Sequence, residues 1–111
     1  MPLLPNAEFA IVPIEKLTDY ALNRDHPVGK HKAAVFESAL GITVNDALFL
    51  RGRILDALLS NDAVLTRQDK FGQRYQMEFE MRIDDRNAII VTSWILEPNE
   101  LFPRLITCYV K

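Results

Sequence analysis

Apolar side chains recur with two different spacings along the 111-residue chain, and the change of spacing divides it into two halves. In the first half, apolar positions lie three or four residues apart, as on the buried face of an amphipathic helix. This pattern predicts three helices, over residues 14–22, 30–40 and 43–60. Thr43 and Asp46 are spaced as in the capping box that often starts a helix.

The second half alternates apolar and polar residues, which is the spacing of a strand with one buried face. It predicts a short strand over 63–67, a half-buried strand opening at Arg74 and Tyr75, and a last strand over 104–110. Residues 88–96 are almost wholly apolar, as expected of a central strand covered on both faces. Polar turns separate the first three strands, so we expect an antiparallel meander.

Helices followed by a meander of about four strands define an α+β fold. We expect a single domain over residues 1–111, with a lead-in at 1–13, a helical half at 14–60 and a sheet at 63–110. The three helices should pack on one face of the roughly four-stranded antiparallel sheet. The other face should then lie partly open to water or to a partner.

Composition narrows the classes of protein that remain. A net charge of −2 counts against a constitutive nucleic-acid binder, although it leaves room for a local basic pocket. There is no long apolar run for a membrane span, no signal-peptide pattern and a single cysteine, so we expect a bacterial-type cytoplasmic protein. Zinc, P-loop and dinucleotide motifs are missing, so we expect no metal and no cofactor.

Lys30, His31 and Lys32 crowd the first turn of the second predicted helix, where the helix dipole already presents partial positive charge. Either these cations are simply solvated, or they form with the free backbone amides a site for an anion such as phosphate. Lys32 shares a helix face with Phe36, so its stem should lie along the sheet while its ammonium reaches the rim. Ordinary snorkelling is the alternative for that side chain.

Further candidates lie on the predicted strands. Arg74 and Arg104 place cations at strand ends, and Thr92 or Thr107 offers a hydroxyl to a phosphate oxygen. The Thr92 hydroxyl lies in an apolar strand and needs a hydrogen-bond partner if it is buried.

The aromatic candidates each have a structural alternative. Tyr75 and Trp94 serve either as core residues or as surfaces that contact an RNA base. His26, which precedes a proline in a loop, either contacts a substrate or caps the turn. Cys108 alternates with apolar neighbours, which indicates a buried structural thiol.

One metal-free reaction uses these groups together, namely attack of an RNA 2′-hydroxyl on its own phosphate. It needs an acid or base, cations for the pentavalent phosphorane, and contacts to the RNA. The candidate catalytic residues are His31, Lys32, Arg74, Thr92, Arg104 and Thr107, and the candidate substrate-binding residues are Lys30, His26, Tyr75 and Trp94.

A loop-and-helix motif and several strand motifs recur in a recognisable order. They are Lys16-Leu17-Thr18-Asp19-Tyr20, Leu22-Asn23, His26-Pro27, Gly29, His31-Lys32-Ala33, Phe36, Ala39-Leu40-Gly41, Asn45, Gly72-Gln73-Arg74-Tyr75, Thr92-Ser93-Trp94 and Arg104-Leu105-Ile106-Thr107. This order resembles an uncharacterised bacterial family of small proteins and C-terminal domains of polymorphic and contact-dependent-inhibition toxins. The order of helices and strands is similar to the barnase/EndoU/colicin/RelE-like ribonuclease fold.

The resemblance implies a metal-independent endoribonuclease with RNA as its substrate, and a cognate antitoxin or toxin protein as its partner. It also implies roles for Lys32 and for the pair Arg74-Tyr75, which match recurring positions of the toxin-like relatives. The leading hypothesis is therefore a toxin-like ribonuclease from a toxin–antitoxin-type pair. The alternatives are a non-catalytic binding module, such as an antitoxin, immunity or scaffold protein, and a binder of a phosphate ligand or nucleotide.

Overall fold

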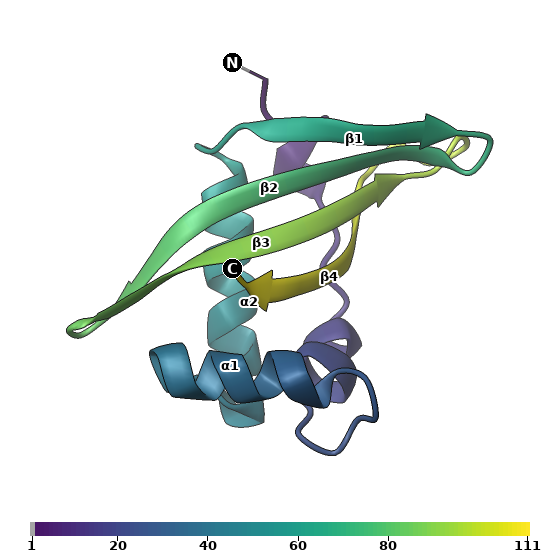
Figure 1. Cartoon of the computed structure of the whole chain (residues 1–111). Coiled ribbons are helices and arrows are strands. Elements are labelled where there is room, and N and C mark those ends of the chain that lie inside the picture. Colours follow the sequence, from purple (N-terminus) through teal and green to yellow (C-terminus); the bar gives the residue numbers. More distant parts are fainter. Residues whose placement is uncertain (1) are drawn as a thin grey trace.

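The computed structural model describes residues 2–111, in which helical segments precede a four-stranded sheet (Figure 1). The strands are antiparallel in the order β1-β2-β3-β4, which confirms the predicted α+β fold. In chain order, the elements are the 3₁₀ turn η1 (Ala7–Phe9), the π-helix η2 (Leu17–Ala21), α1 (Lys30–Leu40), the 3₁₀ turn η3 (Val44–Asp46), α2 (Ala47–Leu58), β1 (Ala63–Asp69), β2 (Gly72–Ile83), β3 (Arg86–Leu96) and β4 (Arg104–Val110).

Local signals in the sequence explain several boundaries. The backbone N–H of Thr43 donates to the Asp46 carboxylate at 2.9 Å, and this capping box opens the helical segment as predicted. The first helix is shorter than predicted and has π rather than α geometry over Leu17–Ala21. β1 and β2 are both longer than predicted, because the two strands stay paired up to Asp69 and Gly72.

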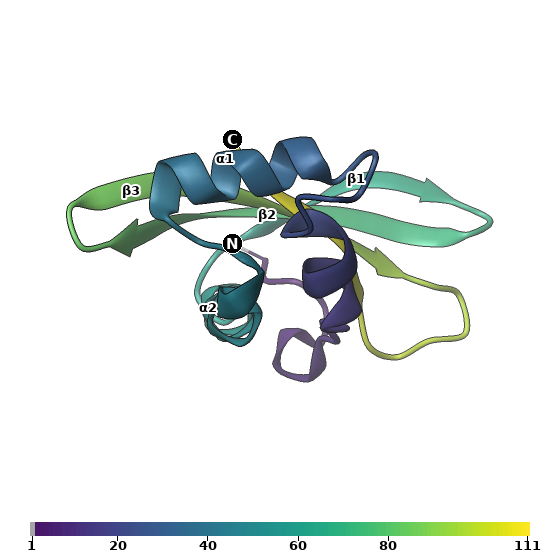
Figure 2. The same cartoon turned by 90° about the horizontal axis from the view of Figure 1, so that it is seen from below.

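The helices cover one face of the sheet and one of its edges. α2 and the N-terminal turns lie on one side of the sheet, whereas α1 lies beside the edge strand β4 (Figures 1 and 2). The lead-in covers the start of that edge, since the N–H of Ile11 donates to the Pro103 carbonyl at 2.8 Å and the N–H of Leu105 donates to the Ile11 carbonyl at 2.9 Å. We call the face opposite α2 the outer face.

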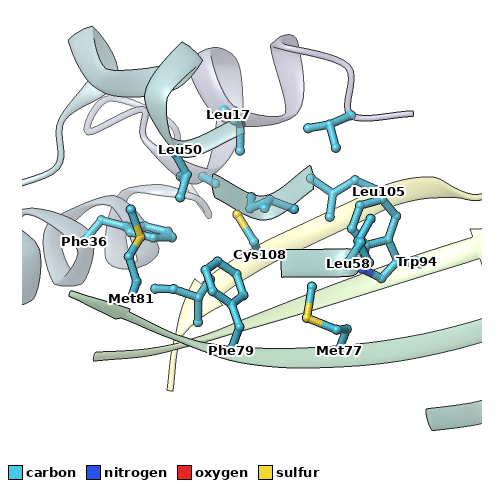
Figure 3. Packing of buried hydrophobic residues seen from close by; sticks show 14 of the residues in the cluster. Leu17, Phe36, Leu50, Leu58, Met77, Phe79, Met81, Trp94, Leu105 and Cys108 are labelled. Atoms are coloured by element: carbon cyan, nitrogen blue, oxygen red, sulfur yellow. The ribbon is translucent and has the colours of Figure 1, made fainter. Parts of the chain in front are cut away.

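The core forms where the helices meet the inner face of the sheet (Figure 3). Met77, Phe79 and Met81 alternate along β2 and point into the core, with Met81 on the side of Phe36 and Met77 on the side of Leu58. The expectation that β3 is covered on both faces is wrong. Although β3 is a central strand, no helix within residues 2–111 packs on its outer face. Of the apolar residues on that face, Val91 is buried but Ile89 is 38% exposed.

Thr92 and Trp94 lie inside this core, so the prediction that they contact a substrate is wrong for this structure. Both are 0% exposed. The Trp94 indole N–H donates to Thr92 Oγ1 at 2.8 Å, and the Thr92 hydroxyl donates to the Met77 carbonyl at 2.7 Å. Thr92 therefore satisfies the polar atom of the tryptophan, which would otherwise be buried without a partner.

Replacing this hydroxyl should destabilise the fold. We expect Thr92→Val to lower the free energy of unfolding by about 1–3 kcal/mol, because the Trp94 N–H loses its acceptor in the core. Urea denaturation followed by tryptophan fluorescence measures the loss. Ser93→Ala, at the half-buried neighbouring position, is the control and should change stability by less than about 0.5 kcal/mol. Equal losses for the two variants would contradict the assigned hydrogen bond.

Candidate functional site

Lys32 forms the centre of a cluster that joins three elements. Its ammonium donates to the Tyr20 hydroxyl of η2 at 3.0 Å and to the Thr107 hydroxyl of β4 at 3.2 Å. The side chain is partly buried, whereas its neighbours Lys30 and His31 in the first turn of α1 are exposed. Of the three predicted cations at the helix start, only Lys32 is therefore held in place. We call Lys32, Tyr20 and Thr107 the lysine cluster.

A close backbone approach brings Tyr20 to Lys32. Gly29, the residue just before α1, lies so near η2 that a Cβ on it would stand 2.2 Å from the Tyr20 carbonyl oxygen. Only glycine leaves room for this approach. Tyr20 itself lies in the π-helix, a geometry that proteins often use at functional sites.

An irregularity in β4 turns Thr107 toward the cluster. Ser93 pairs with Thr107 and Trp94 pairs with Leu105, so Ile106 is an extra residue in β4. Such a bulge re-aims side chains at the sheet edge. Ile106 and Thr107, although adjacent, both line the same cavity.

The positive charge of Lys32 has no anionic partner in residues 2–111. The ion pairs in that part of the chain are Arg24–Glu37, Arg67–Asp69 and Lys111–Glu78. The ammonium lies 4.6 Å from the centroid of the Tyr20 ring and 5.9 Å from that of the Tyr109 ring. Only neutral oxygens and aromatic rings therefore balance this charge.

Cys108 does not supply the missing negative charge. Burial raises the pKa of its thiol to about 12, although the Lys32 ammonium opposes this shift. Because the thiol stays protonated at neutral pH, it does not neutralise the positive charge of Lys32. Each hydroxyl accepts a hydrogen bond from Lys32 through its oxygen and retains its own hydrogen, so the cluster presents several donors to one place.

His26 supports the cluster from the loop before α1. Its Nδ1 accepts hydrogen bonds from the N–H groups of Val28 at 3.0 Å and Gly29 at 2.9 Å, which assigns the ring proton to Nε2. The ring meets Tyr20 edge-on, with centroids 4.8 Å apart. His26 thus caps the turn, which is one of the two roles expected from the sequence. Its Nε2–H group remains available as a donor beside the lysine cluster.

Two cavities adjoin the lysine cluster. The larger, of about 540 Å³, includes Tyr20 and Thr107 in its wall, and the smaller, of about 310 Å³, includes Lys32 and His31. The full linings are Pro13, Glu15, Lys16, Asp19, Tyr20, His26, Ile106 and Thr107 for the first, and His31, Lys32, Val35, Tyr109 and Val110 for the second. The cluster is therefore open to a solute from both sides.

Other predicted residues lie elsewhere. Arg74 and Arg104 line neither cavity, and both are in register with Ile95 on the outer face of the sheet. Tyr75 is half-buried against the core and donates its hydroxyl hydrogen to Gln73 at 2.8 Å. The structure thus separates the arginines from Lys32, instead of gathering all predicted cations in one pocket.

Tyr20 is the principal residue that the sequence did not assign to the site. It occupies an apolar-spaced position of the first predicted helix, which favoured a core role. Its hydroxyl was the available signal, because a phenol on such a face needs a hydrogen-bond partner when it is buried. Glu15 and Asp19, on the same segment, were also unassigned and line the larger cavity.

This arrangement defines an α+β protein with an unpaired lysine held at the edge of its sheet. Residues 3–111 match the family described as Domain of unknown function (DUF6883), and the chain belongs to that family. No match was found among curated proteins or among solved structures.

Two further features of residues 2–111 bear on the site and its setting. They contain no group of three or more His, Cys, Asp or Glu side chains placed to hold a metal ion. No single helix among them is long and apolar enough to cross a membrane, but α1 and the η3–α2 segment pass by length and composition as a pair bent by 77°.

The unpaired charge should cost stability. We expect Lys32→Met to leave the free energy of unfolding unchanged or to raise it by up to about 1 kcal/mol, with no fall in melting temperature. The reason is that an apolar side chain of similar length can pack between the rings of Tyr20 and Tyr109. Calorimetry at neutral pH tests this, with Phe36→Ala, a core truncation expected to cost about 3–5 kcal/mol, as the contrasting variant. A large loss for Lys32→Met would show that the lysine serves the fold.

Proposed function

We propose that the protein is a toxin-like, metal-independent endoribonuclease and one half of a bacterial toxin–antitoxin-type pair. The observation that carries the proposal is the Lys32 ammonium, which two hydroxyl groups position and no carboxylate in residues 2–111 neutralises. Such a cation, with further donors beside it, matches an anion that has several oxygens. A phosphodiester is the proposed ligand.

In the proposed reaction, the RNA 2′-oxygen forms a bond to phosphorus while the bond from phosphorus to the 5′-oxygen breaks. His31 would take the proton of the 2′-hydroxyl as the base, and the departing 5′-oxygen would receive a proton from water. Negative charge gathers on the non-bridging oxygens, where Lys32, Tyr20 and Thr107 would donate hydrogen bonds. Donors already in position contribute most to such transition states, because they need little reorganisation.

The two histidines take different parts in this proposal. His31 lies in the wall of the smaller cavity with Lys32 and is exposed, so it is the candidate for proton transfer. His26 already accepts two backbone hydrogen bonds at Nδ1, and it would serve as a neutral donor to the RNA through Nε2.

A non-catalytic binding module is the second candidate function. It is favoured by the net charge of −2 and by apolar side chains exposed beside the N-terminal lead-in, where the Phe9 and Phe102 rings lie 5.3 Å apart. An antitoxin, immunity or scaffold protein would use such a surface for a protein partner.

Cleavage of RNA by the purified protein in EDTA tests the first candidate. We expect the wild type to cleave and Lys32→Met to be about 10²–10³-fold slower, because it loses the charged donor of the transition state. Tyr20→Phe removes one hydroxyl and should cost about tenfold. Products ending in a 2′,3′-cyclic phosphate, seen by mass spectrometry, identify the reaction.

Lys30→Met is the matched control for the loss of one positive charge. Lys30 lies two residues away on the same helix but is exposed, so its loss should reduce the rate far less than the loss of Lys32. Equal rates for Lys32→Met and the wild type would remove the assigned site. Absence of cleavage, together with a stable complex with a partner protein, would favour the binding module.

A further inference from the structure

Three arginines lie side by side in one row across the sheet. Arg67 of β1 pairs with Arg74 of β2, Arg74 pairs with Ile95 of β3, and Ile95 pairs with Arg104 of β4. Residues paired in this way place their side chains on the same face. We call Arg67, Arg74 and Arg104 the arginine row.

The row belongs to the outer face. Side chains alternate along β2, so Arg74 points away from the inner face that carries Met77. Among residues 2–111, no helix packs on the outer face (Figures 1 and 2). Arg67 and Arg104 are exposed and Arg74 is half-buried, so a ligand can reach both ends of the row.

Within the protein, this arrangement is electrostatically unfavourable. Like charges directly opposite each other on neighbouring strands repel. One carboxylate relieves the repulsion, since Arg67 Nε lies 2.8 Å from Asp69 Oδ2. Arg74 Nε is shielded from solvent and has no hydrogen-bond acceptor in residues 2–111. Arg104, at the other end of the row, is exposed and forms no ion pair within residues 2–111, so an external anion would find an unneutralised charge there.

An uncharged row lies next to the arginine row on the outer face. It consists of Val64, Gln76, Ser93 and Thr107. Glu78 follows in the row after that, where it pairs with Lys111. Because Thr107 also belongs to the lysine cluster, the arginine row leads directly to the proposed phosphate site.

We infer that the arginine row binds the sugar–phosphate backbone of a single-stranded RNA and guides it to the lysine cluster. The choice of RNA rests on the proposed function. The row itself rests on the strand register and on the exposed Arg104, which has no ion pair within residues 2–111. Guanidinium groups suit phosphate oxygens because they donate two parallel hydrogen bonds, and Ile95 in the middle of the row offers an apolar contact to a base.

The test measures binding separately from cleavage. A fluorescent 2′-O-methyl oligonucleotide lacks the attacking hydroxyl, so its anisotropy reports affinity alone. We expect Arg67→Gln and Arg104→Gln each to weaken binding about eightfold in 50 mM salt and about threefold in 200 mM salt. Each should also lower the slope of log affinity against log salt by about 0.7, as for one lost phosphate contact on a single strand.

Arg82→Gln is the matched control, since Arg82 is exposed on β2 and lies on the same face at the opposite end of the strand. It should bind like the wild type. The inference is overturned if the wild type does not bind, if the row variants keep the wild-type slope, or if Arg82→Gln weakens binding equally. It is also overturned if polyglutamate of matched charge displaces the oligonucleotide as well as RNA does, which would indicate an acidic protein partner.

Unmodified RNA separates this inference from the proposed function. If the wild type binds RNA through the arginine row but does not cleave it, the inference about the row stands and the ribonuclease proposal fails. The opposite result is also informative. If cleavage depends on Lys32, but neither cleavage nor oligonucleotide affinity changes in the Arg67 and Arg104 variants, the ribonuclease proposal stands and the role of the arginine row is overturned.

Discussion

The contact between the start of α1 and the carbonyl of Tyr20 is the constraint on which the site depends. Because Gly29 has no side chain, the backbone at the start of α1 can approach the Tyr20 carbonyl so closely that a Cβ atom would not fit between them. Lys32 lies one helical turn after Gly29, and the approach brings its ammonium to the Tyr20 hydroxyl and to Thr107 on the edge strand β4. In the same loop, His26 accepts hydrogen bonds from the backbone N–H groups of Val28 and Gly29. These bonds fix the loop against the start of α1.

The unneutralised positive charge of Lys32 at the sheet edge is unfavourable for stability. Phe36 of α1 is fully buried in the core, and it anchors the helix so that Lys32, four residues earlier, lies along the sheet edge. The hydrophobic contact thus fixes the position of a cation that the rest of the protein does not neutralise. The apolar face of the helix stabilises the fold, whereas the charge at its start has no partner within residues 2–111 that would make it stabilising.

The spacing of apolar residues predicted the fold class because period alone separates helices from strands. Residue-level placement was less predictable, because it depends on pairing. A continuous apolar run such as 88–96 does not reveal which face is inner, so the burial of Thr92 and Trp94 needed the register. Lys32 could be predicted, since its spacing from Phe36 fixes its helix face. The site role of Tyr20 was not predicted, because its ring occupies an apolar position of the first predicted helix and so indicated a core residue.

The arginines show most clearly why sequence was insufficient. Arg74 and Arg104 were expected beside Lys32 because they are cations at predicted strand ends, and the family resemblance implied a role for Arg74, while Arg67 gave no signal. Two irregularities decide their true positions, one between Leu65 and Arg67 and one at Ile106. Each inserts one residue and shifts the pairing that follows, which aligns Arg67 with Arg74 and turns Thr107 toward Lys32. The bulges, which a single sequence does not reveal, therefore determine that Arg67 lies opposite Arg74 and that Thr107 contacts Lys32.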